Sequence, residues 1–280
     1  MTFQFLQPLS LGEATEILNS YEDVRILAGG TDLLILLKDR ILGCRFVMDI
    51  KKIPELNVLG KSEKGLEIGG AVNLNRVLNA GLEGGSYSVL CDGAASLANS
   101  LLRNRATLIG NICNASPGGD MLPPALVLDA TLEAVCASGN RQIPLREFFT
   151  GAKKHILQKN ELVTKITFPE KRGKGIYLKK KRIKGHDLSQ AGVAAFWAHD
   201  GRLSIALGAV APTPVLISGL GPFDKEGLAK ACSDIEREVL GHVKAISDTR
   251  SSRDYRIAMV KYFLNEIISQ WTQPGAEVAV

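Results

Sequence analysis

Residues 24–38 read VRILAGGTDLLILLK, and the fold of the chain is decided in this stretch. An apolar, β-forming run enters two adjacent glycines and leaves as an amphipathic segment, a pattern that predicts strand, tight turn and helix. Thr31 is a residue type that caps helices, so we expect a helix that starts there and continues through Asp32 to Lys38. The backbone N–H groups of residues 29–32 would then crowd at the positive end of that helix.

A turn of this kind is able to bind a phosphate. Gly29 and Gly30 have no Cβ, so a pyrophosphate could come within hydrogen-bonding distance of the backbone N–H groups. A plain strand-to-helix connection is the simpler alternative, because Gly-Gly turns are common. Both interpretations stay open on this stretch alone, and a second loop is needed to separate them.

The composition is that of a globular protein. A chain of 280 residues with 45% hydrophobic and 22% charged residues predicts one large domain or two of ordinary size. The five cysteines are scattered and form no CxxC pair, so we expect buried thiols and no metal on this chain. Neither a signal peptide nor a membrane-spanning apolar stretch is present, which predicts a cytoplasmic protein without membrane insertion.

The positive charge of the chain is concentrated in residues 171–186, KRGKGIYLKKKRIKGH, which hold eight Lys or Arg and no acid. Such a run suggests a nucleic acid, an anionic cofactor, an acidic partner or merely a solvated surface. Only Tyr177 supplies an aromatic side chain. Because nucleic-acid binding usually interleaves aromatics with the basic residues, we expect no nucleic-acid partner.

The order of the sequence patterns predicts an α+β fold. Ser10 and Glu13 have the spacing of a capping box, which predicts a helix to about Ser20, and RFVMDI at residues 45–50 is the strand that completes a β-α-β unit. Further patterns predict strands at residues 66–68, 71–72, 107–112, 176–181, 192–199 and 203–210, a hairpin at Asp200-Gly201, and helices at residues 74–79, 87–102, 226–240 and 253–268.

Residues 107–120 contain a second loop that is compatible with phosphate. Asp120 stands before a helix opened by Pro123 and Pro124, so it is either the N-cap of that helix or a ligand for ribityl or ribose hydroxyls. A carboxylate repels phosphate, which excludes a direct phosphate contact for Asp120. The residues that permit close approach or offer hydrogen bonds are Gly110, Asn111, Asn114 and Ser116.

The two loops, Ala28-Gly-Gly-Thr-Asp-Leu-Leu34 and Gly110-Asn-Ile-Cys-Asn-Ala-Ser-Pro117 with Asp120, resemble a known family. This family is the FAD-binding subunit of molybdenum hydroxylases, to which xanthine dehydrogenase and aerobic carbon monoxide dehydrogenase belong. The resemblance covers nearly the whole chain. It includes the stretches at residues 143–149, 161–169, 177–179, 208–215 and 254–256.

The resemblance implies a two-subdomain FAD-binding unit of the vanillyl-alcohol-oxidase (PCMH) type over residues 1–170, with subdomains at about residues 1–57 and 58–170. A smaller α+β domain with an antiparallel sheet would follow over residues 171–280. The chain would be an oxidoreductase subunit of a heteromeric complex. No inserted cysteine-rich segment is present, so the branch similar to the hydroxybenzoyl-CoA reductases is not expected.

The function implied by the resemblance is electron transfer through noncovalently bound FAD. Electrons would leave a substrate at the molybdopterin of a large subunit, cross the [2Fe–2S] clusters of a small subunit, and pass through FAD to NAD or another acceptor. Lys179 matches a lysine near the isoalloxazine, and Asp120 would meet the ribityl chain or the flavin edge. The full set of implied cofactor-binding residues is Ala28, Gly29, Gly30, Thr31, Asp32, Leu33, Thr107, Gly110, Asn111, Asn114, Ser116, Asp120 and Lys179.

One departure from the family pattern and two alternative functions remain. Ile109 stands where relatives usually have glycine, and a β-branched residue resists positive φ and close backbone approach, so we expect an altered loop or weaker FAD binding. The first alternative is a self-sufficient FAD-dependent oxidase or reductase with its own substrate site. The second is an interaction subunit that kept the fold and lost the flavin.

Overall fold

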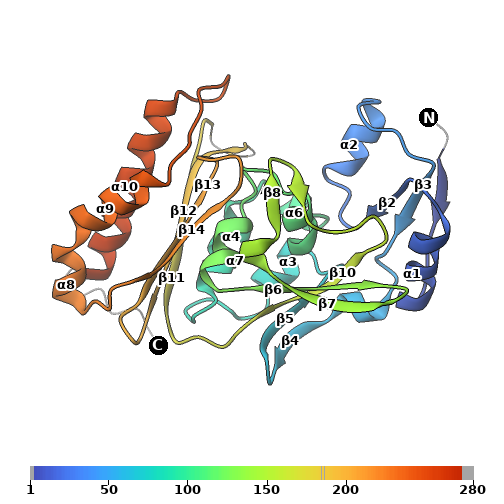
Figure 1. The fold of residues 1–280 in the computed structure, drawn as a ribbon, viewed down its shortest axis with the longest axis horizontal. Helices are drawn as coiled ribbons and strands as arrows, with labels where there is room; N and C mark the ends of the chain where they lie inside the picture. Colours follow the sequence, from blue (N-terminus) through green and yellow to red (C-terminus); the bar gives the residue numbers. More distant parts are fainter. Residues whose placement is uncertain (1–2, 184, 186, 273–280) are drawn as a thin grey trace.

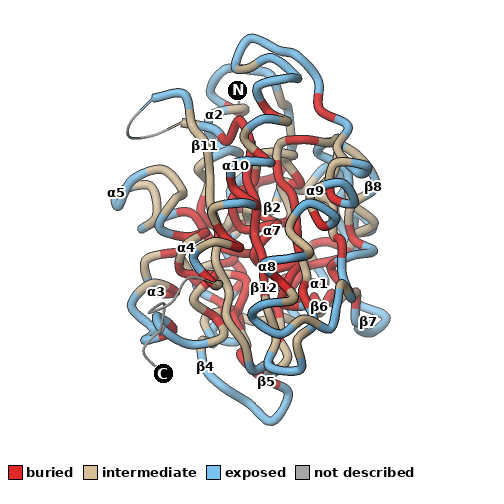
Figure 2. Tube along the Cα trace, turned by 90° about the vertical axis from the view of Figure 1, so that its left-hand side faces the viewer, coloured by how far each residue is buried: buried red, intermediate tan, exposed pale blue. Residues whose placement is uncertain are grey.

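The computed structural model describes residues 3–183, 185 and 187–272. Figure 1 shows three main sheets that follow one another along the molecule, with helices between and beside them. The N-terminal sheet lies at one end and helices α8, α9 and α10 lie at the other. Buried residues run through the middle of the molecule and the connecting loops are mostly exposed (Figure 2).

The N-terminal sheet is parallel, with the strand order β1-β3-β2, which confirms the predicted β-α-β unit. The predicted capping box is present in a shifted form: the Ser10 hydroxyl accepts the Glu13 N–H at 3.2 Å, and the Glu13 carboxylate accepts at 2.8 Å the N–H of Leu9, the residue before the N-cap. The elements are β1 (Gln4–Leu6), α1 (Leu11–Ser20), β2 (Val24–Leu27), α2 (Leu33–Lys38) and β3 (Phe46–Asp49).

The middle of the chain forms an antiparallel sheet with the order β4-β5-β10-β6-β7. Strand β10 is the last strand of this part in the sequence, and it pairs with β5 on one side and with β6 on the other, so it lies at the centre of the sheet. The helices between β5 and β6 in the sequence pack on the sheet that β10 completes. The elements are η1 (Pro54–Asn57), β4 (Leu59–Ser62), β5 (Gly65–Gly69), α3 (Leu74–Leu78), α4 (Ser88–Ser96), α5 (Ser100–Arg103), α6 (Leu108–Cys113), α7 (Leu122–Val127), β6 (Thr131–Cys136), β7 (Gly139–Pro144), η2 (Leu145–Glu147), β8 (Phe149–Gly151), β9 (Lys154–His155) and β10 (Leu162–Phe168).

The C-terminal part is a second antiparallel sheet, ordered β11-β12-β13-β14, followed by three helices. The predicted hairpin at Asp200-Gly201 joins β12 to β13, and Gly201 has a φ of +84°, which glycine tolerates. The elements are β11 (Gly173–Lys181), β12 (Ser189–Ala198), β13 (Leu203–Gly208), β14 (Val215–Leu220), α8 (Lys225–Lys230), α9 (Cys232–Gly241) and α10 (Arg253–Thr272).

Strand β12 is buried on both faces, because successive side chains of a strand point to opposite sides. Val193 and Ala195 belong to the core beneath α10, whereas Ala194 and Phe196 belong to the core shared with the middle part of the chain. This two-sided burial explains the nearly continuous apolar run of β12. It also means that the C-terminal sheet packs on the middle part through one face and on α10 through the other.

Several predicted elements are wrong in detail. Residues 107–112 form helix α6 and not a strand, because Thr107 caps the helix and its hydroxyl accepts the Gly110 N–H at 2.9 Å. Residues 71–72 lie outside any strand. The helix predicted over residues 87–102 is α4 and α5, separated where Ala98 adopts a φ of +48°, and the one over residues 226–240 is α8 and α9. Short apolar runs do not distinguish strand from helix by period alone.

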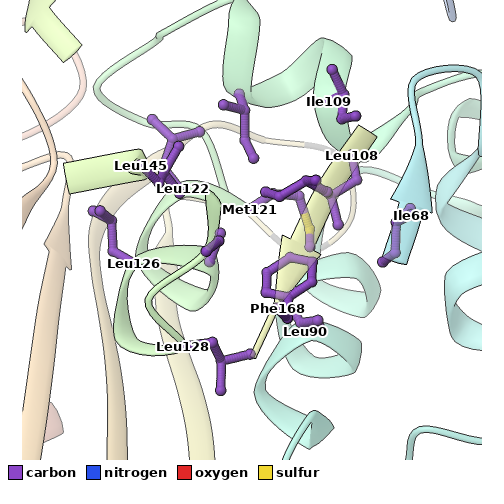
Figure 3. Close-up of a cluster of buried hydrophobic side chains, with 14 of the residues drawn as sticks. Ile68, Leu90, Leu108, Ile109, Met121, Leu122, Leu126, Leu128, Leu145 and Phe168 are labelled. Carbon is purple, nitrogen blue, oxygen red and sulfur yellow. The ribbon is translucent and has the colours of Figure 1, made fainter. Parts of the chain in front are cut away.

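The premise that Ile109 stands at a position whose backbone needs glycine is also wrong, whereas weaker FAD binding stays a prediction. Ile109 lies inside α6, where the backbone has ordinary helical angles, and its side chain is 4% exposed. Figure 3 shows Leu108 and Ile109 beside the buried cluster that includes Met121 and Leu122. Ile109 is therefore a core residue, and its branched side chain meets no conformational conflict.

We expect Ile109→Gly to lower the free energy of unfolding by about 3 to 5 kcal/mol, because it removes a buried side chain and places glycine inside a helix. Ile109→Val is the matched control and should cost about 1 kcal/mol. Urea denaturation of the three proteins measures both values. A Gly variant as stable as wild type would contradict the core role.

Candidate cofactor-binding site

The first loop of the candidate site connects β2 to α2 and contains both glycines of the opening stretch. A Cβ on Gly29 would lie 2.2 Å from the Arg105 carbonyl oxygen and 2.9 Å from the Ala106 Cα, closer than real Cβ contacts. Gly30 has a φ of +76°, a conformation that glycine adopts at little cost. The first glycine therefore lets this loop touch the chain just before α6, and the second allows the turn.

Five consecutive backbone N–H groups of this loop, from Gly29 to Leu33, donate to no acceptor among the residues that the structure describes. They surround the N-terminus of α2. The first hydrogen bond at this end of the helix is donated by the Leu34 N–H to the Gly30 oxygen. The prediction that Thr31 caps the helix is wrong. Asp32 occupies the N-cap position and makes no capping bond, because its carboxylate accepts from Asn114 instead.

The second loop runs from the end of α6 to α7 and lies against the first. The Asn114 amide donates to the Asp32 carboxylate at 3.1 Å, which joins the two loops across 82 residues. The Asn111 amide oxygen accepts the Met121 N–H at 3.1 Å and so holds the far end of the loop. Among the described residues, no acceptor is found for the N–H groups of Ser116, Gly118 and Asp120.

Asp120 is a buried carboxylate and not a helix cap. Met121 is the N-cap of α7, and Asp120 forms an ion pair with Lys179 of β11, with 2.7 Å between Oδ2 and Nζ. The Tyr177 hydroxyl donates to its other oxygen at 3.3 Å. Burial raises the pKa of the Asp120 carboxyl, and the Lys179 ammonium opposes this rise. The two charged residues that the sequence pointed to separately are thus direct partners.

All three donors of the Lys179 ammonium have an acceptor within the protein. Besides Asp120 they are the Ser96 oxygen at 3.3 Å and the Asp187 oxygen at 3.2 Å, and the Lys179 side chain is only 3% exposed. Strand alternation places Tyr177 on the same face of β11 as Lys179. The pair is neutral as a unit, so Lys179 does not present a free cation to its surroundings.

The basic run is largely satisfied within the chain. Lys171 pairs with Asp129, Lys174 lies over the Trp197 ring at 5.8 Å, and Lys181 donates to the Gly185 oxygen at 2.8 Å. Arg182 lies 3.9 Å from the Asp187 carboxylate, while Lys184 and His186 fall outside the described residues. Much of the positive charge therefore stabilises β11 and its connection to β12.

Sequence reasoning missed how α4 meets the edge of β11. Asp92 accepts the Tyr177 N–H at 3.0 Å, and the Ser88 hydroxyl donates to the Gly175 oxygen at 3.0 Å. These two side chains replace the missing neighbouring strand and fix β11 beside the second loop. Their spacing of four residues on a helix rich in small residues was the available signal.

The structure thus brings the predicted residues into one region, and three of their side chains already have polar partners within the protein. Thr107 is 3% exposed and its hydroxyl is used as the cap of α6, and the Asp120 and Lys179 side chains already satisfy each other.

A surface hollow of about 560 Å³ lies elsewhere, between β4 and the end of α3, and contains no predicted site residue. In the described part of the chain, no His, Cys, Asp or Glu cluster is arranged to hold a metal and no helix is long and apolar enough to cross a membrane.

Comparisons with known proteins agree with this architecture. Residues 1–171 match the family model of the FAD binding domain in molybdopterin dehydrogenase. The xanthine dehydrogenase FAD-binding subunit of Escherichia coli O157:H7 is 30% identical over an alignment of 275 residues that covers 93% of each chain. Among solved structures, quinoline 2-oxidoreductase from Pseudomonas putida 86 has a TM-score of 0.87 at 26% identity and covers 98% of both chains. Carbon monoxide dehydrogenase from Hydrogenophaga pseudoflava has a TM-score of 0.85 at 27% identity, covering 95% of this chain and 96% of the other.

The contact of Gly29 with the backbone before α6 gives a direct test. Gly29→Ala should lower the free energy of unfolding by roughly 3 kcal/mol, because the new methyl group meets backbone atoms that cannot rotate away. Gly12→Ala is the control: its Cβ would have no neighbour closer than 3.9 Å, and alanine inside α1 should stabilise by about 0.5 to 1 kcal/mol. Urea denaturation compares the two, and equal stabilities would refute the close contact.

Proposed function

The chain belongs to the family of FAD-binding domains of molybdopterin dehydrogenases, its cofactor is FAD, and from this premise we propose that it transfers electrons within a molybdenum hydroxylase complex. The observation that carries the proposal is the meeting of the two glycine-containing loops, joined by Asn114 and Asp32 and lined with unpartnered N–H groups. Such an array suits a dinucleotide, whose phosphates need several donors at once.

The proposal assigns the FAD-binding unit to residues 1–170, in two subdomains at about residues 1–57 and 58–170 of the vanillyl-alcohol-oxidase (PCMH) type. A C-terminal domain would comprise residues 171–280, of which 273–280 lie outside the described residues. The core beneath α10 supports this division, because its buried residues all lie from Ala191 onward, and the N-terminal sheet has small cores of its own. The other face of β12 contributes to the core of the middle part, so the two domains would share one packed interface.

The residues of the two loops fit the phosphate part of FAD. Gly29 and Gly30 carry no side chain that would cover the N–H groups of residues 29–33, and the N-terminus of α2 favours an anion. Ser116 and Asn114 would supply the second side of the pyrophosphate from the other loop. The Asp32 carboxylate accepts from Asn114 and keeps its negative charge, so the phosphate contacts would be made by the backbone N–H groups and not by this side chain.

Asp120 and Lys179 would act at the flavin end of the cofactor as a pair. The pair is neutral and rigid, so its role is to orient the ribityl chain or the edge of the flavin ring and to exclude water. The Tyr177 hydroxyl holds Asp120 in place through a 3.3 Å hydrogen bond. FAD itself supplies the redox chemistry, since a flavin takes up electrons singly and releases them as a pair. The electrons would come from the iron–sulfur small subunit beside the molybdopterin large subunit, and NAD is one candidate acceptor.

The alternative of a self-sufficient flavoenzyme finds no support in His155 or His242. His155 stacks on Phe148 with 5.3 Å between ring centroids, and burial lowers its pKa. His242 pairs with Glu238 on the surface of α9. His186 lies outside the described residues. A dedicated proton donor beside the flavin would be needed for this function.

The isolated chain is expected to bind one FAD noncovalently. Titration of FAD into the purified, flavin-free protein should quench the flavin fluorescence with a stoichiometry near one, and heat or acid should release intact FAD. Chromatography of the supernatant identifies the released flavin. Pigment that stays with the precipitated chain would refute noncovalent binding, FMN in the supernatant would refute the dinucleotide, and no binding at all would favour the flavin-free interaction subunit.

Lys179→Met should lower the midpoint potential of the bound FAD at alkaline pH, where the Asp120 carboxyl is ionised. It leaves the Asp120 carboxylate unpaired, so the site gains a negative charge that opposes reduction of the flavin. A unit charge at an effective dielectric of about 20 is worth a few kcal/mol, or on the order of 50 mV for a two-electron couple. Because burial raises the pKa of Asp120, the difference should shrink as the pH falls and the carboxyl becomes protonated.

Two further variants test whether the potential shifts because the ion pair is lost or because one positive charge is removed from the basic run. Lys180→Met removes an equally basic neighbour whose side chain pairs with no site residue among those that the structure describes, and the potential of this variant should stay near that of wild type. The double variant Lys179→Met with Asp120→Asn restores a neutral site, so its potential should return towards that of wild type. Dye-equilibrated titration measures all four proteins, and equal shifts for Lys179→Met and Lys180→Met would refute the assignment.

A further inference from the structure

Arg256 is a buried cation in α10, far in sequence from both loops of the cofactor site. Its side chain is 4% exposed and donates to three separate acceptors: the Gln190 oxygen at 2.6 Å, the Ala209 oxygen at 2.9 Å and the Asp248 carboxylate at 2.7 Å. Two of these acceptors lie at neighbouring strand ends, at the start of β12 and just after β13. Arg256 thus fixes both strand ends from the helix that covers them.

Ala209 connects this arginine to the second loop of the site. Its carbonyl accepts from Arg256, and its N–H donates to the Pro117 oxygen at 2.7 Å. Between these two bonds the Ala209 backbone adopts a φ of +62°, which is unfavourable for a residue other than glycine and persists only where the surroundings hold it. The two hydrogen bonds lie on either side of the strained Cα.

The turn around Pro117 rests closely on the strand ends that Arg256 holds. A Cβ on Gly208 would lie 3.0 Å from the Pro123 ring, and one on Gly118 would lie 3.7 Å from the Ser189 oxygen. The turn itself is closed by the Gly119 N–H, which donates to the Ser116 oxygen at 2.9 Å. A shift of Ala209 would therefore move the backbone N–H groups of residues 116–120.

We propose that Arg256 is a positioning residue for the FAD loop at residues 116–120 and acts through Ala209 and Pro117. The inference rests on the FAD site proposed above. Arg256 touches no cofactor in this scheme. It holds the left-handed backbone conformation at Ala209. Through its bond to Pro117, Ala209 then fixes the position of the turn and so the positions of the N–H groups of Ser116, Gly118 and Asp120.

A general role in stability is the competing explanation, so the test needs a control that destabilises the same helix without reaching the loop. Ile267 is 1% exposed, lies in α10, and packs in the core beneath that helix. Ile267→Ala should therefore lower the melting temperature while the hydrogen bonds at Ala209 stay in place. Arg256→Met removes the donors and keeps a side chain of similar reach. Arg256→Lys keeps the charge but gathers its donors on one nitrogen, which cannot reproduce the spread of the guanidinium donors over the three acceptors.

Three measurements are made on flavin-free protein: the melting temperature, amide hydrogen exchange at residues 116–121 and 209, and the FAD dissociation constant by fluorescence titration. Arg256→Met should raise the dissociation constant at least tenfold and speed exchange of the Ala209 N–H. Arg256→Lys should fall between Arg256→Met and wild type. Ile267→Ala should keep the dissociation constant within threefold of wild type, even at an equal or larger loss of melting temperature.

Each result decides the inference. Equal dissociation constants for Arg256→Met and Ile267→Ala at matched stability would overturn it, as would unchanged exchange at Ala209. Should Arg256→Met fail to fold, wild-type exchange and affinity in Arg256→Lys would overturn it in the same way. A wild-type protein that binds no FAD would refute the proposed function instead, and the exchange data would still decide whether Arg256 positions the loop.

Discussion

The buried ion pair between Lys179 and Asp120 constrains how the C-terminal sheet packs on the middle part of the chain. It joins a strand of the C-terminal sheet to the loop before α7, 59 residues apart, and its side chains are 3% and 8% exposed. Taking two charges out of water is costly, and their attraction offsets this cost only when the remaining donors and acceptors are satisfied as well. Ser96, Tyr177 and Asp187 satisfy them, so β11, α4 and the second loop must be in register before the pair is favourable.

The glycine contact adds a constraint of another kind. Gly29 fits against the backbone at Arg105 and Ala106 only because it has no Cβ, and this fit sets the distance between the N-terminal sheet and α6. The ion pair of Lys179 with Asp120 sets the distance between the C-terminal sheet and the loop that connects α6 to α7. The candidate site therefore forms only where three parts of the chain come together, which is a common location for cofactor sites.

The parts of the site that carry local signals could be predicted from the sequence. The strand before Gly29, the turn, the helix to Lys38 and the capping box at Ser10 all follow from patterns within a few residues, and all are present. The partnership of Asp120 with Lys179 could not be predicted, because each charge has a plausible local role and the pairing depends on how two sheets pack. The same limit explains the segment after Thr107, whose apolar residues suit a strand or a helix equally well until the surrounding core selects α6.

A site built mainly from backbone N–H groups leaves few side chains to recognise in the sequence. What the sequence can reveal is where a side chain is absent, as at Gly29 and Gly30. The groups themselves cost little before the cofactor binds, since water can satisfy them, and each then exchanges water for a charged oxygen with a gain of roughly 1.5 to 3 kcal/mol. That gain is realised only if many N–H groups already point in the required directions, because ordering a loop on binding consumes the same free energy. In the proposed site, residues such as Asn111, whose amide oxygen accepts the Met121 N–H, would also contribute to affinity by holding the backbone of the loop in place.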